Sequence, residues 1–519
     1  MQQNDIAYTG GSSFALIRGH ILDFYEYSAQ YLGENNYLNY LIPTYIIFAL
    51  WNIPLALVGL VYPPTLPVPY GVLMWYKALP TLFFVLSSFL FRNIIEQVQK
   101  DSENSDNSNW DIFLFLTTPT AFFSQMIFGQ YDIFTVFFML LAIQKYFGSS
   151  RKDFFFFSLF FGLATTFKYL ALLFYLPLLL YREKRFRELL KSLILYFIPI
   201  TLAILPYIGS NAFINGVFGF GVVSYIFIPI IPEYIGKLYL VPFLWSIICV
   251  YAYSKKSAIG VKKQCQDIAF LGNLGVWIAF GISFWHPQWL MIATPFLVLS
   301  LIQSEQKSLI CLLDLLSMLC FSIFVVNTWP DHVDQNLFSL GLFRSWISPR
   351  LFGMLKMRNI YPHIDRDLVY TGFSALLMAR TILSYPDLKE TVPFSDLSTH
   401  TWYRLRGYVG ISIFVIPMII CLISAIHAPL IYFNTSVSEN SIKISYLTSA
   451  DCDEVQFAVW SEEEGQDDLQ WYPAEQQDDT SWKYDVDLKK HGSIGNYYIH
   501  VYVNTDGVQS RTVSTTVQV

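Results

Sequence analysis

Two charged residues lie within long apolar segments of this chain, where a charge is expensive to bury. Asp132 belongs to the stretch GQYD, and Lys168 lies in TTFKYLALLF without an acidic neighbour in the sequence. An ionisable side chain at membrane depth is a candidate functional residue, because placing it there costs free energy. A carboxylate in such a position can serve as a general base, and a lysine can bind phosphate as a point charge. Each also has a simpler interpretation: Asp132 would cap the following helix, and Lys168 would extend to the membrane surface.

Further polar side chains interrupt a later apolar segment at WHPQ. His286 and Gln288 flank Pro287, where a helix is expected to begin. His286 has the chemistry to contact a phosphate or a sugar hydroxyl group; the alternative is an interfacial histidine between Trp285 and Trp289. The sequence therefore offers His286 and Gln288 as candidate substrate-binding residues.

These residues are held by apolar segments that approach the length of a membrane span. The hydrophobic fraction is 54% and the charged fraction is 14%, whereas soluble domains carry about 25% charged residues. Because a span needs about 20 apolar residues, the composition predicts a polytopic α-helical membrane protein with roughly 11–13 membrane helices. The runs that approach or reach this length are 44–62, 72–91, 111–128, 189–208, 267–284, 288–303, 309–327 and 409–432.

Short loops rich in Lys and Arg predict the orientation of these segments, since such loops are typical of the cytoplasmic side. The three basic loops are 145–152, 182–191 and 255–263. Residues 153–181 must then cross outward and return, as two short helices that meet near Lys168. GQYD and WHPQ also turn at the outer face in this topology. We therefore expect Asp132, Lys168 and His286 to converge on the outer side of the membrane.

Three segments do not fit a simple series of crossings. The run 44–62 is interrupted by Pro54 and is expected not to cross fully, and one crossing is expected within 368–384. The first twenty-odd residues have the pattern of an amphipathic loop, and residues 14–32 suit a helix that lies in the membrane interface.

The composition changes abruptly at Ser436. Residues 436–519 carry 15 acidic and 5 basic residues, a charge of −10, whereas the whole chain carries −6. Short alternating segments separated by Asp, Gly and Asn predict a small antiparallel sandwich. We therefore expect a helical membrane domain at 1–435 and an all-β sandwich at 436–519. The expected strands are 455–460, 469–472, 482–488, 497–503 and 510–519.

The segments GQYDIFTVFFMLLAIQ, FFGLATTFKYLALLFYLPLLL and FWHPQWLMIATPFLV resemble, in this order, the GT-C membrane glycosyltransferases. The resemblance is greatest to multi-spanning mannosyltransferases of the GPI mannosyltransferase I type and their bacterial relatives, and it covers roughly residues 5–305. It implies the transfer of a sugar, mannose or a similar hexose, from a polyprenyl-phosphate donor to an envelope glycan or lipid. The family has a membrane span before its first external loop, and this sequence shows none before Asp5.

The same resemblance implies roles for individual residues. Asp5 corresponds to the acidic residue of the first external loop and would be the general base, with Asp23 as a second possibility. Lys168, His286 and Gln288 would lie on the phosphate side. Asp132 and Gln130 would orient the acceptor, or would hold a metal ion, Mg or Mn, together with Asp5. No cofactor is implied with certainty, and the cysteine spacings match no zinc motif.

The tail segments AVWSEEEGQDDLQWYPAE and YDVDLKKHGSIGNYYIHVYV resemble the Bsp-like repeat of streptococcal and clostridial surface proteins. This resemblance implies a Gram-positive source and an extracellular tail. Together with the predicted spans, it implies a multi-pass protein of the plasma membrane. Trp471 or Tyr472 would make weak stacking contacts with a glycan.

Two other classes of function remain open. A polysaccharide or lipid transporter, or a flippase, would also place charges along a pathway, but it predicts an internal repeat that the spans do not show. A non-catalytic anchor that displays the tail would need no convergent Asp, Lys and His. The expected partners are a lipid-linked sugar donor, a glycan or lipid acceptor and the membrane, and no nucleic acid.

Overall fold

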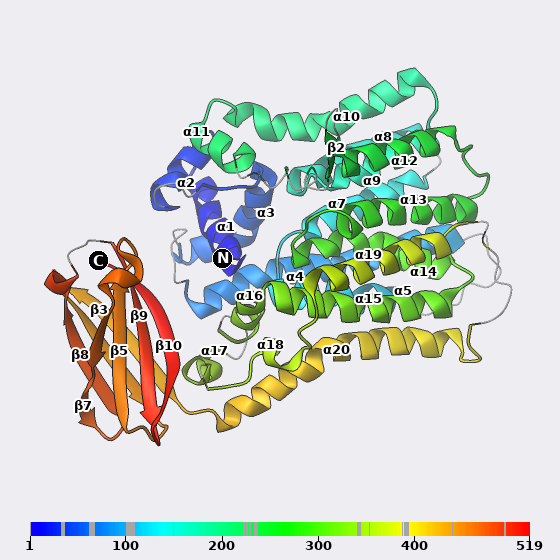
Figure 1. The fold of residues 1–519 in the computed structure, drawn as a ribbon. Helices are drawn as coiled ribbons and strands as arrows, with labels where there is room; N and C mark the ends of the chain where they lie inside the picture. Colours follow the sequence, from blue (N-terminus) through cyan, green and yellow to red (C-terminus); the bar gives the residue numbers. More distant parts are fainter. Residues whose placement is uncertain are drawn as a thin grey trace. The chain divides into compact units, whose positions relative to one another are not determined.

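The computed structural model shows a mostly helical chain with a C-terminal β-sandwich (Figure 1). It describes residues 2–519 except 33–36, 62–67, 100–108, 149, 220, 222–223, 225–226, 228–229, 233–236, 340–343, 352, 387, 389–393, 439 and 492–494, and it describes no side chains for 2–5, 230–232 and 339. The chain forms two compact units. The first comprises Met1–Trp329 and His363–Phe414, and the second comprises Pro330–Pro362 and Val415–Val519.

Several helices are long and apolar enough to span a membrane. By length and composition there are four among the described residues, or five if the bent pair Trp110–Leu116 (α5) and Pro119–Phe128 (α6 and η1), which meet at 55°, forms one span. The four are α4 (Tyr70–Gln99), α10 with η2 (Phe186–Tyr207), α15 (Lys307–Thr328) and α20 (Thr399–His427). These helices, together with the sandwich, confirm the predicted fold class, while the number of 11–13 membrane helices stays a prediction.

Shorter helices complete the first unit. They are α1 (Gln2–Ile17), α2 (Phe24–Leu32), α3 (Ile42–Leu57), α7 (Ile133–Tyr146), α8 (Arg151–Phe167), α9 (Ala171–Arg182), α12 (Leu240–Ser254), α13 (Val261–Gly281), η5 (Pro287–Ala293), α14 (Thr294–Gln303) and α19 (Arg366–Leu383). One expectation is confirmed here. Residues 153–181 form two helices that meet near Lys168, as expected. The segment 368–384 is helical, but α19 is not among the helices apolar enough to span, so the crossing expected there stays a prediction.

The beginning of the chain differs from the sequence prediction. It forms helix α1 instead of an amphipathic loop, and the side chains of Ile6, Ser13 and Phe14 are at most 2% exposed. Asn52 of α3 holds this helix by donating hydrogen bonds to the Gly10 carbonyl (3.1 Å) and to Ser13 Oγ (3.0 Å). The sequence did not predict this helix because the small residues of α1 form no apolar run. They instead permit close approach between helices.

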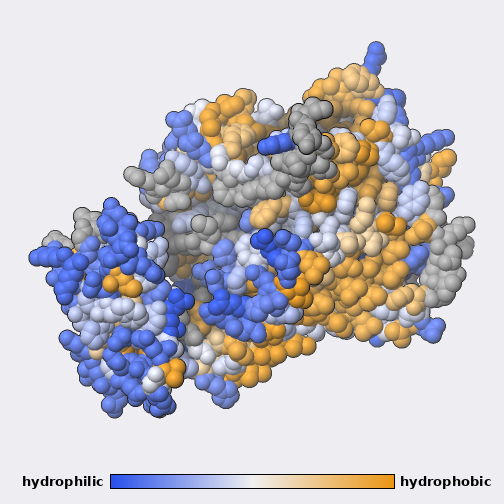
Figure 2. All heavy atoms as spheres, viewed as in Figure 1, coloured by the Kyte–Doolittle hydropathy of each residue, from blue (hydrophilic) through white to orange (hydrophobic). Residues whose placement is uncertain are grey.

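Glycines allow the helices of the first unit to pack closely. A Cβ atom on Gly10 would lie 2.6 Å from the ring of Tyr76 in α4, and one on Gly162 of α8 would lie 2.0 Å from the Tyr196 carbonyl oxygen of α10. In the same unit, α13 packs against α14 and α19, and α19 packs against α15 (Figure 1). On the face shown in Figure 2, hydrophobic residues gather over the helices and hydrophilic residues over the sandwich.

The second unit contains the sandwich and short helices from 330–362. Its two four-stranded antiparallel sheets have the orders β10-β9-β5-β6 and β3-β4-β8-β7. The strands are β3 (Ile431–Ser438), β4 (Ser441–Thr448), β5 (Glu454–Ser461), β6 (Gln470–Pro473), β7 (Glu475–Asp478), β8 (Ser481–Asp487), β9 (Asn496–Thr505) and β10 (Val508–Gln518). The five predicted strands are confirmed, and β3, β4 and β7 are additional. The domain boundary at 435/436 stays a prediction.

The sandwich core forms from alternate residues of its strands. Ile442, Phe457, Tyr497 and Val501 are fully buried, as expected when one face of each sheet is covered by the other. Tyr472 belongs to this core and is 5% exposed, whereas its neighbour Trp471 is 45% exposed. Only Trp471 of this pair is therefore placed to stack on a ligand.

Candidate functional site

The candidate site is centred on the turn between η1 (Ser124–Phe128) and α7. Gly129 adopts the left-handed conformation at φ = +56°, which favours glycine. This conformation reverses the chain and presents Gln130 and Asp132 at the beginning of α7. Both side chains are buried, at 3% and 2% exposure.

Asp132 and Lys168 form an ion pair inside the helical unit. Lys168 follows the last residue of α8, and its Nζ lies 3.3 Å from Asp132 Oδ1. Lys168 is 6% exposed, so the ammonium group does not extend to the surface in this structure. Asp132 occupies the N-cap position of α7, yet its side chain makes no capping hydrogen bond. The geometry therefore favours a buried pair over either of the two simpler interpretations.

One oxygen of this carboxylate is left over. Asp132 Oδ2 is buried and has no hydrogen-bond partner among the described residues. A buried acceptor without a partner costs free energy, so such atoms mark places where a ligand or a proton can be accommodated.

Aromatic rings surround the ammonium group of Lys168. Its Nζ lies 4.3 Å from the centre of the Trp289 ring and 5.6 Å from that of Tyr40, distances at which a cation is attracted to the face of a ring. Tyr40 also contacts the ring of Tyr131 at 4.7 Å. These rings fix Lys168 in position within the apolar surroundings.

The WHPQ segment joins this group through η1 and η5. Ser124 Oγ donates a hydrogen bond to the Pro287 carbonyl oxygen at 2.8 Å. The ring of His286 lies 5.3 Å from that of Trp289, which contacts Lys168. Gln288 is buried, at 5% exposure. The structure thus brings the three segments around Asp132, Lys168 and His286 together, as expected from the sequence.

Helix α1 approaches the same turn. Thr9 donates a hydrogen bond to the hydroxyl oxygen of Tyr131 at 3.1 Å, and Asp5 lies one turn before Thr9 on α1. The side chain of Asp5 lies outside the described part of the structure, so its role stays a prediction. Asp23, the second possibility, pairs with His20 at 2.8 Å and is 59% exposed between α1 and α2.

Two residues of this region were missed by the sequence analysis. Lys77 of α4 lies in the apolar run 72–91, and its Cδ and Cε atoms are 3.9 Å from the position of a Cβ on Gly129. Gln125 of η1 is 3% exposed, and neither of its side-chain polar atoms has a partner among the described residues. The rule that identified Lys168 would also have identified Lys77; Gln125 carries no such signal.

A second buried charge cluster has a structural role. Asp314 of α15 accepts hydrogen bonds from Arg380 of α19 and from Arg406 of α20, the latter at 2.5 Å. Arg406 also donates to the Leu114 carbonyl (3.1 Å) and to Thr118 Oγ1 (3.0 Å). All three charged side chains are at most 8% exposed. The cluster therefore connects α5, α15, α19 and α20, and its arginines serve packing.

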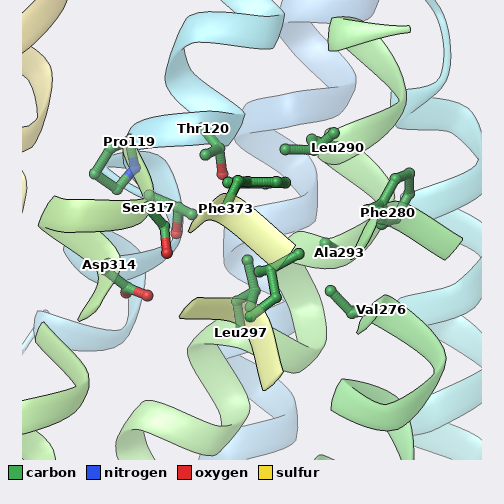
Figure 3. Close-up of a pocket in the computed structure, with 12 residues that line it drawn as sticks. Pro119, Thr120, Val276, Phe280, Leu290, Ala293, Leu297, Asp314, Ser317 and Phe373 are labelled. Carbon is green, nitrogen blue, oxygen red and sulfur yellow. The ribbon is translucent and has the colours of Figure 1, made fainter. Parts of the chain in front are cut away.

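A pocket beside Asp314 lies close to this cluster (Figure 3). Its lining is mostly apolar, from residues such as Val276, Phe280, Leu297 and Phe373. None of the six predicted site residues lines it. Since both oxygens of Asp314 are already engaged by arginines, the pocket has no free charge with which to do chemistry.

The metal hypothesis gains no ligand set from the side chains that are described. Among them, no three or more His, Cys, Asp or Glu side chains come together as a metal site. Near the turn, Asp132 is the described residue that offers a carboxylate oxygen without a partner. The role of Mg or Mn stays a prediction.

Two regions of the chain match known protein families. Residues 46–259 match glycosyltransferase family 87, and residues 434–518 match the GBS Bsp-like repeat. The first match includes Lys77, Gln130, Asp132 and Lys168. No curated protein and no solved structure matches the chain. The chain thus contains a region similar to the membrane glycosyltransferases of family 87, a GT-C type family, and a C-terminal region similar to a repeat of surface proteins.

Proposed function

We propose that this family 87 membrane glycosyltransferase moves a hexose from a polyprenyl-phosphate donor to a glycan or lipid of the cell envelope. The observation that carries the proposal is the buried pair of Asp132 and Lys168, at 3.3 Å, within the family 87 region. Mannose is the sugar that the likeness to GT-C mannosyltransferases favours. Reaction at the outer face of the plasma membrane is supported by the surface-protein repeat at 434–518.

The reaction needs a base and a stabilised leaving group. The acceptor oxygen forms a bond to the anomeric carbon, and the bond from that carbon to the donor phosphate oxygen breaks with its electron pair. The acceptor proton passes to a carboxylate, and the phosphate leaves on its polyprenyl chain. Asp5 is the proposed base, and Asp132 and Gln130 are proposed to orient the acceptor.

Positive and hydrogen-bonding groups stabilise the departing phosphate in this mechanism. Lys168 and His286 are proposed for the phosphate side, with Gln288 as a hydrogen-bonding neighbour. The aromatic rings around Lys168 exclude water, which strengthens these interactions. The apolar helices around the site suit a polyprenyl chain, because both partition into the hydrocarbon of the bilayer.

A donor panel tests this function. The purified full chain, reconstituted in lipid, is given polyprenyl-phosphate mannose, polyprenyl-phosphate glucose or the corresponding nucleotide sugars, together with envelope lipids and glycans as acceptors. We expect transfer from a polyprenyl-phosphate sugar and stoichiometric release of polyprenyl phosphate. Transfer from nucleotide sugars alone would contradict the proposed donor class.

A further inference from the structure

We propose that Lys77 is a phosphate-binding residue of this site and supplies the positive charge that holds the polyprenyl-phosphate group. This inference rests on the proposed function, because it assigns a residue to the phosphate of the proposed donor. Lys77 belongs to α4, one of the helices long and apolar enough to span the membrane. It lies within the region that matches family 87.

The first argument concerns the position of the side chain. The Cδ and Cε atoms of Lys77 lie 3.9 Å from where a Cβ on Gly129 would be. The methylene groups next to the ammonium group therefore lie against the turn that carries Gln130 and Asp132. A lysine that merely extended to the membrane surface would direct its ammonium group away from the protein, whereas this one lies against a buried turn.

The second argument concerns charge. Lys168 already has a counter-ion in Asp132 at 3.3 Å. For the ammonium group of Lys77, the described residues provide neither an ion pair nor a hydrogen bond. Because an unpaired charge is costly within the membrane, Lys77 calls for an anion. A phosphate group on a lipid chain supplies that anion at the depth of the helix.

The third argument concerns the neighbours of the turn. Gln125, five residues before Gln130, has a buried side-chain amide without a partner among the described residues. A phosphate oxygen is a strong acceptor, and an amide nitrogen can donate to it. A cation on α4 and an unsatisfied donor on η1, both beside Gly129, are the chemistry expected of an anion site.

The test measures binding of a short probe, farnesyl phosphate, against farnesol, which lacks the phosphate. The full chain is purified in detergent in the variants Lys77→Met, Lys77→Gln and Lys77→Arg. Lys255→Met is the matched control, because Lys255 is a part-buried lysine of the same unit that pairs with Asp267 at 2.6 Å. Thermal melting of each variant verifies that it is folded.

We expect the native chain to bind farnesyl phosphate more tightly than farnesol. Lys77→Met and Lys77→Gln should lose roughly tenfold or more in affinity for farnesyl phosphate, while farnesol binding stays unchanged. Lys77→Arg and Lys255→Met should bind both probes like the native chain. Native-like binding of farnesyl phosphate by both uncharged variants would overturn the role of Lys77 and leave the proposed function intact.

Two other outcomes would also overturn the inference, for distinguishable reasons. If the native chain does not prefer farnesyl phosphate to farnesol, the proposed donor class fails together with it. If Lys77→Met lowers the melting temperature and Asp5→Asn added to it restores both the melting temperature and farnesyl phosphate binding, Lys77 is the counter-ion of Asp5. The lysine would then serve to hold α1 and not to bind phosphate.

Discussion

Lys168 Nζ lies 3.3 Å from Oδ1 of Asp132. Lys168 follows the end of α8, whereas Asp132 precedes the start of α7. The pair links the turn at Gly129 to the junction between α8 and α9. A buried ion pair is costly to break from one side, because the remaining charge is left without a partner.

Breaking this pair should destabilise the helical unit. We expect Lys168→Met to lower the free energy of unfolding by about 3–5 kcal/mol, since it leaves Asp132 buried and unpaired. The double variant Lys168→Met with Asp132→Asn should recover much of this loss, because no charge remains. Melting temperatures in detergent test the comparison, and equal losses in the single and double variants would show that the two residues are not coupled.

The orientation of the chain has a direct test. We expect Leu22→Cys, which is exposed between α1 and α2, to react with an impermeant thiol reagent added to intact cells. Lys152→Cys, in a predicted cytoplasmic loop, should react only after the membrane is permeabilised. The background chain would lack its six native cysteines. Labelling of position 152 alone from outside would reverse the predicted topology.

Replacing the proposed base, Asp5, should affect the rate of transfer but not the binding of the donor. Asp5→Asn should lower the rate of sugar transfer by about 10²-fold or more, because the amide keeps the shape of the side chain but cannot accept the proton. Donor binding should be retained. Asp23→Asn is the comparison, since Asp23 is exposed and pairs with His20. Transfer lost only in the second variant would move the role of base to Asp23.

The sandwich should fold by itself and be dispensable for transfer. Deletion of 436–519 tests whether the sandwich is dispensable for transfer. To test whether it folds by itself, residues 429–519 should be isolated, because β3 begins at Ile431. Within it, Trp471→Ala should weaken glycan binding with little loss of stability, since this ring is 45% exposed. Tyr472→Ala should cost about 3–5 kcal/mol, because it empties part of the core. The opposite pattern would place the ligand-binding ring elsewhere.

The isolated sandwich should also lose stability in acid. Burial alone would raise the pKa of Asp468, but hydrogen bonds from Ser461 and His491 lower it below the usual value of 3.8. A lowered pKa stabilises the fold above the pKa of the unfolded chain, and this contribution is lost as the pH falls through the folded value. Asp468→Asn should therefore flatten the dependence of stability on pH below about pH 4. Unfolding curves between pH 2 and 7 measure this, and unchanged curves would contradict it.

The elements that the sequence predicted well are those with a strong local pattern. The long apolar runs became helices, and the turns at GQYD and WHPQ fall where polar residues interrupt them. The meeting of Asp132 with Lys168 followed from counting crossings between basic loops, although the pattern could not give the distance between them.

The elements that were missed depend on contacts between distant segments. Helix α1 is stabilised by Asn52 and by close packing at Gly10, neither of which leaves a periodic apolar pattern. Lys77 and Asp314 lie in apolar runs as Lys168 does, so the same rule points to them as candidates, but the rule does not give their surroundings. For Asp314, partners in α19 and α20 decide its role, and no local pattern reports such partners.

The most direct test of the account compares two carboxylates in the transfer assay. Asp132 and Asp267 are both buried in the helical unit, and each pairs with a lysine, at 3.3 Å and 2.6 Å. Transfer from a polyprenyl-phosphate hexose is measured for Asp132→Asn and Asp267→Asn at a temperature where both variants are folded, and the rate is normalised to the amount of protein, because each change leaves a lysine unpaired. The account predicts a loss of about 10²-fold for Asp132→Asn, because an acceptor that is no longer oriented reacts more slowly by about that factor, and near-native transfer for Asp267→Asn. Near-native transfer by Asp132→Asn would contradict the placement of the reaction at this site.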